Sequence, residues 1–151
     1  MAAFRFPLQK VLDHRARLVD LRARDLAAAE SAAAGVAARI AERRSAQQRC
    51  QEAAGAGARL DVALLAARSA WIDRLDREIA TLAQERQRAL AAVAAARDAL
   101  QAAWRDREVL AQLRERRYGQ WRQAEARRDT RDLDEIGGQR RAREKRQTVA
   151  G

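Results

Sequence analysis

The 151-residue chain has little of what compact, secreted or catalytic proteins commonly use. Aromatic residues make up 4% of it, and it contains one Pro, one Cys and one His. A lone cysteine cannot form an internal disulfide, which fits a reducing compartment. One His and one Cys do not supply a metal-ligand set, and no Gly-rich stretch has the Lys and the strand–loop–helix setting of a phosphate-binding loop. We therefore expect a protein that is not an enzyme and needs no cofactor or small-molecule substrate.

Long apolar runs are missing as well. The sequence has no run of 18 apolar residues, so no membrane-spanning helix is predicted. The opening Met1–Pro7 also lacks the apolar region of a signal peptide. The expected location is therefore cytoplasmic.

The residues that are abundant favour helices. There are 38 Ala and 29 Arg but only 2 Lys, and charged residues make up 34% of the chain. Ala, Arg, Leu, Glu and Gln are strong helix formers, whereas the β-branched and aromatic residues of strands are scarce. The net charge of +10 is compatible with binding to nucleic acid, an anionic membrane or an acidic protein. Because Asp and Glu interrupt the basic residues throughout, the charge does not decide among these partners.

Apolar residues recur with a spacing of alternately three and four, the heptad pattern of a coiled coil. Eight of twelve such positions are apolar between Leu12 and Cys50, and nine of ten between Ile72 and Ala103. The pattern continues more weakly through Leu110 to Trp121. This repeat predicts two long helices that share one seam.

Two glycines, Gly55 and Gly57, separate the repeats and predict a turn at about 54–58. The alternative is one continuous helix in an extended parallel dimer. The favoured prediction is an all-α antiparallel coiled-coil hairpin spanning 1–138, with helices over about 7–53 and 59–136. Pro7 suits the first helical turn, Gly137-Gly138 predicts the end of the second helix, and 139–151 is expected to be a flexible basic tail.

The predicted turn also sets a register. Folding about the two glycines places residue 4 opposite roughly residue 108 and Arg15 near Asp98, so the second helix overhangs beyond about residue 110. From Ala111 to Arg146 there are 12 Arg or Lys against 7 Asp or Glu, together with Tyr118 and Trp121. This overhang is either a solvated helix face or a basic, aromatic surface for a partner.

Both ends of the sequence carry a family resemblance, in Phe4–Arg15 and Leu26–Glu30 near the start and in Leu113–Tyr118, Trp121–Arg128 and Leu133–Ile136 near the end. These segments resemble the FliJ family, the small coiled-coil proteins of the flagellar type III export apparatus. The Ala-rich middle adds little.

The resemblance implies a hairpin similar to the central stalk of rotary ATPases. Its implied partners are the hexameric export ATPase (FliI-like), the export gate (FlhA-like), the ATPase regulator (FliH-like) and export chaperones. It implies that the protein promotes assembly and activity of the ATPase ring at the flagellar basal body, peripherally associated with the inner membrane. The end with both termini would enter the ring, and the hairpin tip would face the gate.

Charge and exposure, not the resemblance, suggest the contact residues. The expected ring contacts are Phe4, Arg5, Arg114, Arg117 and Trp121. The expected gate contacts are Arg44, Gln48, Arg59 and Trp71.

Three other functions remain open from the sequence. An injectisome stalk protein would have the same architecture. A nucleic-acid-binding coiled coil would use the +10 charge, although no uninterrupted basic arm is present and nucleic-acid binding is not expected. A tropomyosin-like structural coiled coil is the third.

Overall fold

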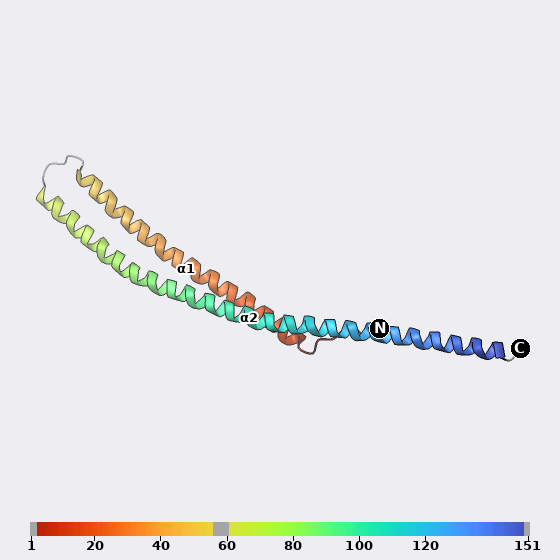
Figure 1. The fold of residues 1–151 in the computed structure, drawn as a ribbon. Helices are drawn as coiled ribbons and strands as arrows, with labels where there is room; N and C mark the ends of the chain where they lie inside the picture. The colour runs from red at the N-terminus through yellow and green to blue at the C-terminus, as the bar shows by residue number, and fades with distance from the viewer. Residues whose placement is uncertain (1–2, 56–60, 150–151) are drawn as a thin grey trace. The chain divides into compact units, whose positions relative to one another are not determined.

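The computed structural model describes residues 3–55 and 61–149. It contains helix α1, Gln9–Gly55, and the longer helix α2, Val62–Val149 (Figure 1). Contacts divide the chain into two compact units. The terminal unit comprises Met1–Ala16 and Arg105–Gly151, and the hairpin unit comprises Arg17–Trp104. The predicted all-α class with a longer second helix is confirmed.

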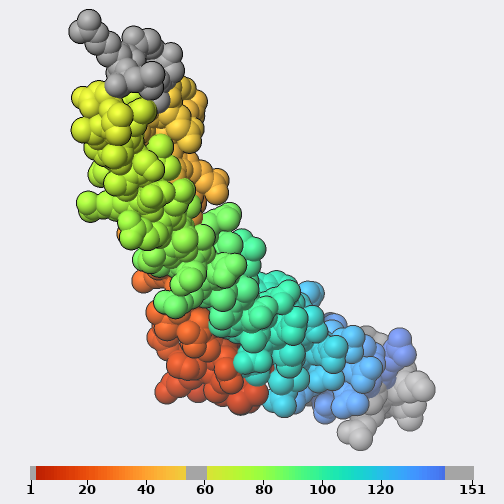
Figure 2. All heavy atoms as spheres, turned by 90° about the vertical axis from the view of Figure 1, so that its left-hand side faces the viewer, coloured from red at the N-terminus to blue at the C-terminus, as the bar shows by residue number. Residues whose placement is uncertain are grey.

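In the hairpin unit, α1 and α2 lie side by side and run antiparallel (Figure 1). Every heptad position of α1 from Val19 to Cys50 is fully or partly buried, as the repeat requires. Leu75 is the most buried side chain, with 1% of its surface exposed. The side chains of α2 fill most of the face seen in Figure 2, with α1 at their edge. The buried residues described in this unit all occupy heptad positions: Ala33, Ile40, Leu75, Leu82, Val93 and Ala103.

Ion pairs across the seam hold the antiparallel register of the hairpin unit. Arg43 Nε lies 2.9 Å from Glu78 Oε2, and Arg39 Nη1 lies 3.1 Å from Glu85 Oε2. A third pair joins Arg97 to Glu30 at 2.8 Å. All three are solvent-accessible, and exposed pairs contribute at most about 1 kcal/mol each. The apolar seam therefore provides most of the stability, while the ion pairs disfavour shifted registers.

Local hydrogen bonds mark where each helix begins. The Asp61 carboxylate accepts hydrogen bonds from the amides of Ala63 (2.9 Å) and Leu64 (3.4 Å), which is the arrangement of a helix N-cap. In the terminal unit, Pro7 lies in a turn and α1 starts two residues later, at Gln9. The helices thus begin slightly later than the predicted positions 7 and 59.

The predicted end of the second helix at residue 136 was wrong. α2 continues through Gly137 and Gly138 to Val149. A glycine in a helix interior costs about 1 kcal/mol relative to Ala but does not by itself end the helix. Strong helix formers on both sides, such as Glu135 and Gln139–Arg141, carry the helix across these two positions.

The predicted register was also wrong by about two helical turns. In the terminal unit Arg15 pairs with Asp106 at 3.0 Å, whereas Asp98 was expected. The midpoint between the two helices lies later in the sequence than the two glycines, because α1 extends to Gly55 and α2 starts only at Val62. Phe4 contacts Tyr118 and Trp121, not residue 108. This contact follows the same register as the pair of Arg15 with Asp106, since eleven residues before Arg15 lie opposite about twelve residues after Asp106.

Replacing Gly35 by alanine should stabilise the hairpin. Gly35 lies in the interior of α1, and a Cβ built there meets no atom within 4 Å. The substitution should therefore raise the free energy of unfolding by about 0.5–1 kcal/mol through helix propensity alone. Urea unfolding followed by circular dichroism measures this change, and destabilisation would show that the position is more crowded than the structure indicates.

The pairing of Arg15 with Asp106 can be tested by a double-mutant cycle. Reversing the charge of each residue alone should destabilise slightly, and reversing both should restore part of the loss. We expect a coupling energy below about 1 kcal/mol because both side chains are solvent-accessible. The same cycle on Arg15 and Asp98 is the control and should give no coupling. Coupling to Asp98 alone would favour the register predicted from the two glycines.

Candidate functional site

In the terminal unit, three aromatic side chains meet on α2. We call Phe4, Tyr118 and Trp121 the aromatic cluster. The Phe4 ring packs edge-on against Tyr118 with 5.3 Å between centroids and lies 5.9 Å from Trp121, while Tyr118 and Trp121 stack at 5.8 Å. Phe6 is buried, with 7% exposed. Each aromatic pair contributes about 0.5–1.5 kcal/mol beyond area burial, so the cluster fixes the N-terminal residues on α2.

The aromatic cluster is only partly covered. Tyr118 remains 38% exposed, and Phe4 and Trp121 are half-buried. Tyr, Trp and Arg are the residue types most often dominant in protein interfaces, particularly where they are grouped. In a chain with 4% aromatic residues, this grouping is the most interface-like feature of the terminal unit.

Basic side chains surround the cluster on two sides. One hollow, of about 440 Å³, is lined by Phe4, Phe6 and Pro7 together with Arg5, Gln9, Lys10 and Arg114. The other, of about 550 Å³, is lined by Ala3, Phe4, Arg5, Pro7, Arg117, Gln120, Trp121 and Ala124. Among the residues that the structure describes, none that lines either hollow is acidic. Within residues 3–55 and 61–141, no carboxylate lies within ion-pair distance of Arg5, Lys10, Arg114 or Arg117. The site is thus suited to bind anionic groups.

The structure brings all five expected ring contacts into this one place. Phe4 and Arg5 come from the segment before α1, and Arg114, Arg117 and Trp121 come from three successive turns of α2. Lys10 was not predicted. A signal for it was present in the sequence, where this basic residue closely follows Phe4, Arg5 and Phe6.

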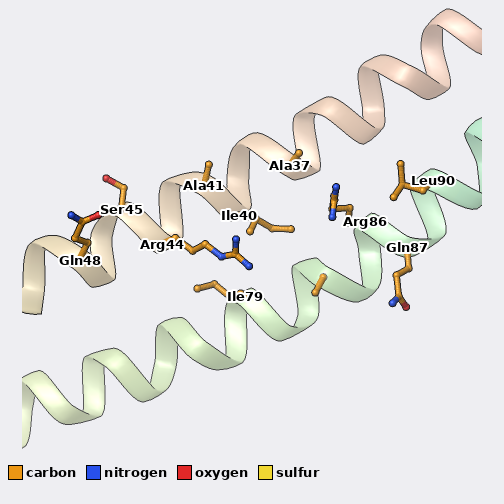
Figure 3. Close-up of a pocket in the computed structure, with 11 residues that line it drawn as sticks. Ala37, Ile40, Ala41, Arg44, Ser45, Gln48, Ile79, Arg86, Gln87 and Leu90 are labelled. Carbon is orange, nitrogen blue, oxygen red and sulfur yellow. The ribbon is translucent and has the colours of Figure 1, made fainter.

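A second surface lies between α1 and α2 in the hairpin unit (Figure 3). This interhelical groove, as we name it, has a volume of about 640 Å³. Its apolar part includes Ile40, Ile79 and Leu90, the last with 47% of its surface exposed. The remaining lining residues are Ala37, Ala41, Arg44, Ser45, Gln48, Ala83, Arg86 and Gln87.

The two sides of the seam differ in how their charges are compensated. On one side Arg39 and Arg43 pair with Glu85 and Glu78 and line a smaller hollow. On the groove side, Arg44 extends from α1 toward α2, and Arg86 extends from α2 toward α1 (Figure 3). Among the described side chains, neither of these two arginines has an ion-pair partner. The groove therefore presents positive charge beside an apolar surface.

The expected gate contacts divide between this groove and other places. Arg44 and Gln48 both line the groove. Trp71 does not line it; the ring is 47% exposed and the guanidinium of Arg74 lies 5.9 Å from its centroid. Arg59 lies outside the described residues. Arg86 was missed, although an arginine at a heptad position otherwise filled by apolar residues was a visible anomaly in the sequence.

The remaining features do not point to catalysis. His14 is exposed and Cys50 is half-buried. Among the residues that the structure describes, no three His, Cys, Asp or Glu side chains gather as a metal site would need. In the same part of the chain, no helix has the length and hydropathy to cross a bilayer.

Comparison with protein-family models shows which family the sequence resembles over most of its length. A family model described as the flagellar FliJ protein covers residues 4–146. No curated protein and no solved structure matches the chain significantly.

Proposed function

The chain belongs to the FliJ family of non-catalytic flagellar proteins, and from this we propose that it is the stalk of the export ATPase ring. As a family member it is a component of the flagellar export apparatus. In the proposed role the terminal unit binds the centre of the hexameric ATPase and promotes its assembly and activity. The hairpin unit binds the export gate and couples it to the ring. The protein works in the cytoplasm, at the inner-membrane face of the basal body.

One observation supports the proposed contact with the ATPase ring. Five residues chosen from the sequence for charge and exposure lie together around the aromatic cluster, with no carboxylate lining the hollows beside them. The arginines favour acidic groups in the ring through complementary charge.

The interhelical groove supports the second proposed contact, with the export gate. Its open apolar surface and two uncompensated arginines suit an amphipathic helix that carries carboxylates beside its apolar face. An ATPase regulator and export chaperones are further partners in this proposal. An injectisome stalk would have the same geometry, but the matching family model is the flagellar one.

Reversing both groove charges should abolish gate binding. The Arg44→Glu/Arg86→Glu variant should lose at least tenfold in affinity for the purified cytoplasmic part of the gate protein, because its carboxylates would repel an acidic helix. Isothermal titration calorimetry measures this affinity. Arg24→Glu/Arg88→Glu, which makes the same change in net charge at two exposed positions outside the groove, is the matched control and should bind normally. Equal loss in both variants would mean that net charge, not the groove, governs binding.

Co-sedimentation tests the ring contact. The cognate ATPase should form hexamers at a lower concentration when the full chain is present, with about one chain in each hexamer. A chain that leaves ATPase sedimentation unchanged would contradict the stalk role. Nanomolar DNA binding at physiological salt in that case would favour the nucleic-acid alternative.

A further inference from the structure

The residues that precede α1 form a strap across α2. This N-terminal strap, residues 3–8, is non-helical over residues 3–6 and ends in a turn over residues 7–8, where the Gln9 amide donates a hydrogen bond to the Phe6 carbonyl (3.1 Å). Phe4 anchors it by its contacts with Tyr118 and Trp121. Phe6, buried to 7% exposure, provides a second apolar attachment. The strap is thus held by aromatic packing, with no ion pair to α2 among its described side chains.

Docking the strap brings like charges together. Arg5 lines both hollows, sharing one with Arg114 and Lys10 and the other with Arg117. Arg114 and Arg117 are also three residues apart on α2, a spacing at which like charges destabilise a helix. The aromatic contacts of Phe4 therefore hold the strap in place against electrostatic repulsion. A bound anion in the hollows would relieve that repulsion and stabilise the docked strap.

We propose that the docked strap and α2 together form a cradle for a carboxylate-rich protein segment. Two of the cations, Arg5 and Lys10, come from the strap and the first turn of α1, so the cradle is complete only while the strap is docked. Strap docking and ligand binding are consequently coupled, and each favours the other. The cradle rests on the proposed ring contact. It adds that the ring supplies carboxylate groups on a segment of protein chain.

The surroundings favour an acidic protein segment over a free inorganic anion. The guanidinium of arginine can donate two parallel hydrogen bonds to one carboxylate. It therefore selects a ligand by its geometry as well as by its charge. The hollows measure about 440 and 550 Å³, far more than one small anion occupies. Trp121 and the partly exposed Tyr118 ring offer apolar contact to the methylene groups of glutamate side chains or to neighbouring apolar residues.

The test uses the full chain and a labelled peptide of alternating glutamate and leucine, followed by fluorescence anisotropy. The acidic peptide should bind, the same peptide with glutamine for glutamate should bind at least tenfold more weakly, and inorganic phosphate at equal ionic strength should not displace it. Phe4→Ala removes no charge yet should weaken peptide binding at least tenfold, because the strap and Arg5 leave α2. Phe4→Tyr should restore binding. Arg131→Gln, elsewhere on α2, should leave it unchanged.

Three results would overturn the proposal: equal binding of the glutamine peptide, displacement by phosphate, or unchanged affinity in Phe4→Ala with unchanged helicity. The assay contains no ATPase, so it is separate from the test of the ring contact. Peptide binding without ATPase binding would refute the stalk role and leave the cradle. ATPase binding that Phe4→Ala does not weaken would refute the cradle and leave the stalk role.

Discussion

Insertion of one alanine between Ala80 and Thr81 should destabilise the hairpin by at least about 3 kcal/mol, the typical cost of losing one buried leucine. Each residue of an α-helix turns the chain by about 100°, so the insertion rotates all later positions of α2 away from α1. Leu82, Val93 and Ala103 are buried heptad residues that would leave the seam. The ion pair between Arg39 and Glu85 would break as well.

Thermal unfolding followed by circular dichroism measures this effect. The control is one alanine inserted between Thr130 and Arg131, where both side chains of α2 are exposed. That insertion should leave the unfolding temperature nearly unchanged. An equal melting temperature for the two variants would mean that the heptad seam does not stabilise the protein.

Reversal of two charges beside the aromatic cluster should remove most of the affinity for the ATPase. In Arg114→Glu/Arg117→Glu, each hollow loses one cation and gains a carboxylate. Buried or grouped interface arginines commonly contribute 2 kcal/mol or more, so we expect the affinity to fall by at least thirtyfold. Both side chains are exposed in the free protein, so folding should be preserved.

Surface plasmon resonance against the immobilised ATPase hexamer measures this loss. Arg127→Glu/Arg131→Glu makes the same change in net charge on the same helix, away from the aromatic cluster, and should weaken binding by less than threefold. Raising the salt concentration should reduce wild-type affinity because exposed charges are screened. If the control pair weakens binding as much as the first pair, general attraction between charged surfaces would explain the interaction.

The sequence was sufficient to predict the pairing of two helices along one seam. The heptad positions from Val19 to Cys50 and the buried Leu75 and Leu82 were identifiable because side-chain burial in a coiled coil follows the period of the helix directly. Arg86 is the exception, since it occupies a heptad position but remains exposed beside the groove.

The register and the helix ends were not predictable to the same degree. Heptads repeat every seven residues, so a shift of about one repeat preserves the apolar match and changes only the cross-helix partners. The pairing of Arg15 with Asp106 therefore depends on where the turn forms, which two glycines did not specify. The helix end predicted at Gly137 and Gly138 was wrong because the low helix propensity of glycine is a weak constraint where strong helix formers lie on both sides.

The candidate site was predictable in its residues but not in its geometry. Phe4, Arg5 and the basic part of α2 were expected to act together, yet the register predicted from the turn would have kept Phe4 away from Trp121. Their contact follows from the observed register, in which Arg15 pairs with Asp106 and Phe4 lies against Tyr118. The cradle was therefore visible only once this register was known.

The most direct test of the stalk role is the ATP hydrolysis rate of the cognate export ATPase, titrated with this protein while light scattering follows ring assembly. The rate should rise with ring assembly and saturate near one chain per six ATPase subunits, since a central stalk occupies each ring once. Saturation near one chain per subunit, or no stimulation at any ratio, would contradict a central stalk.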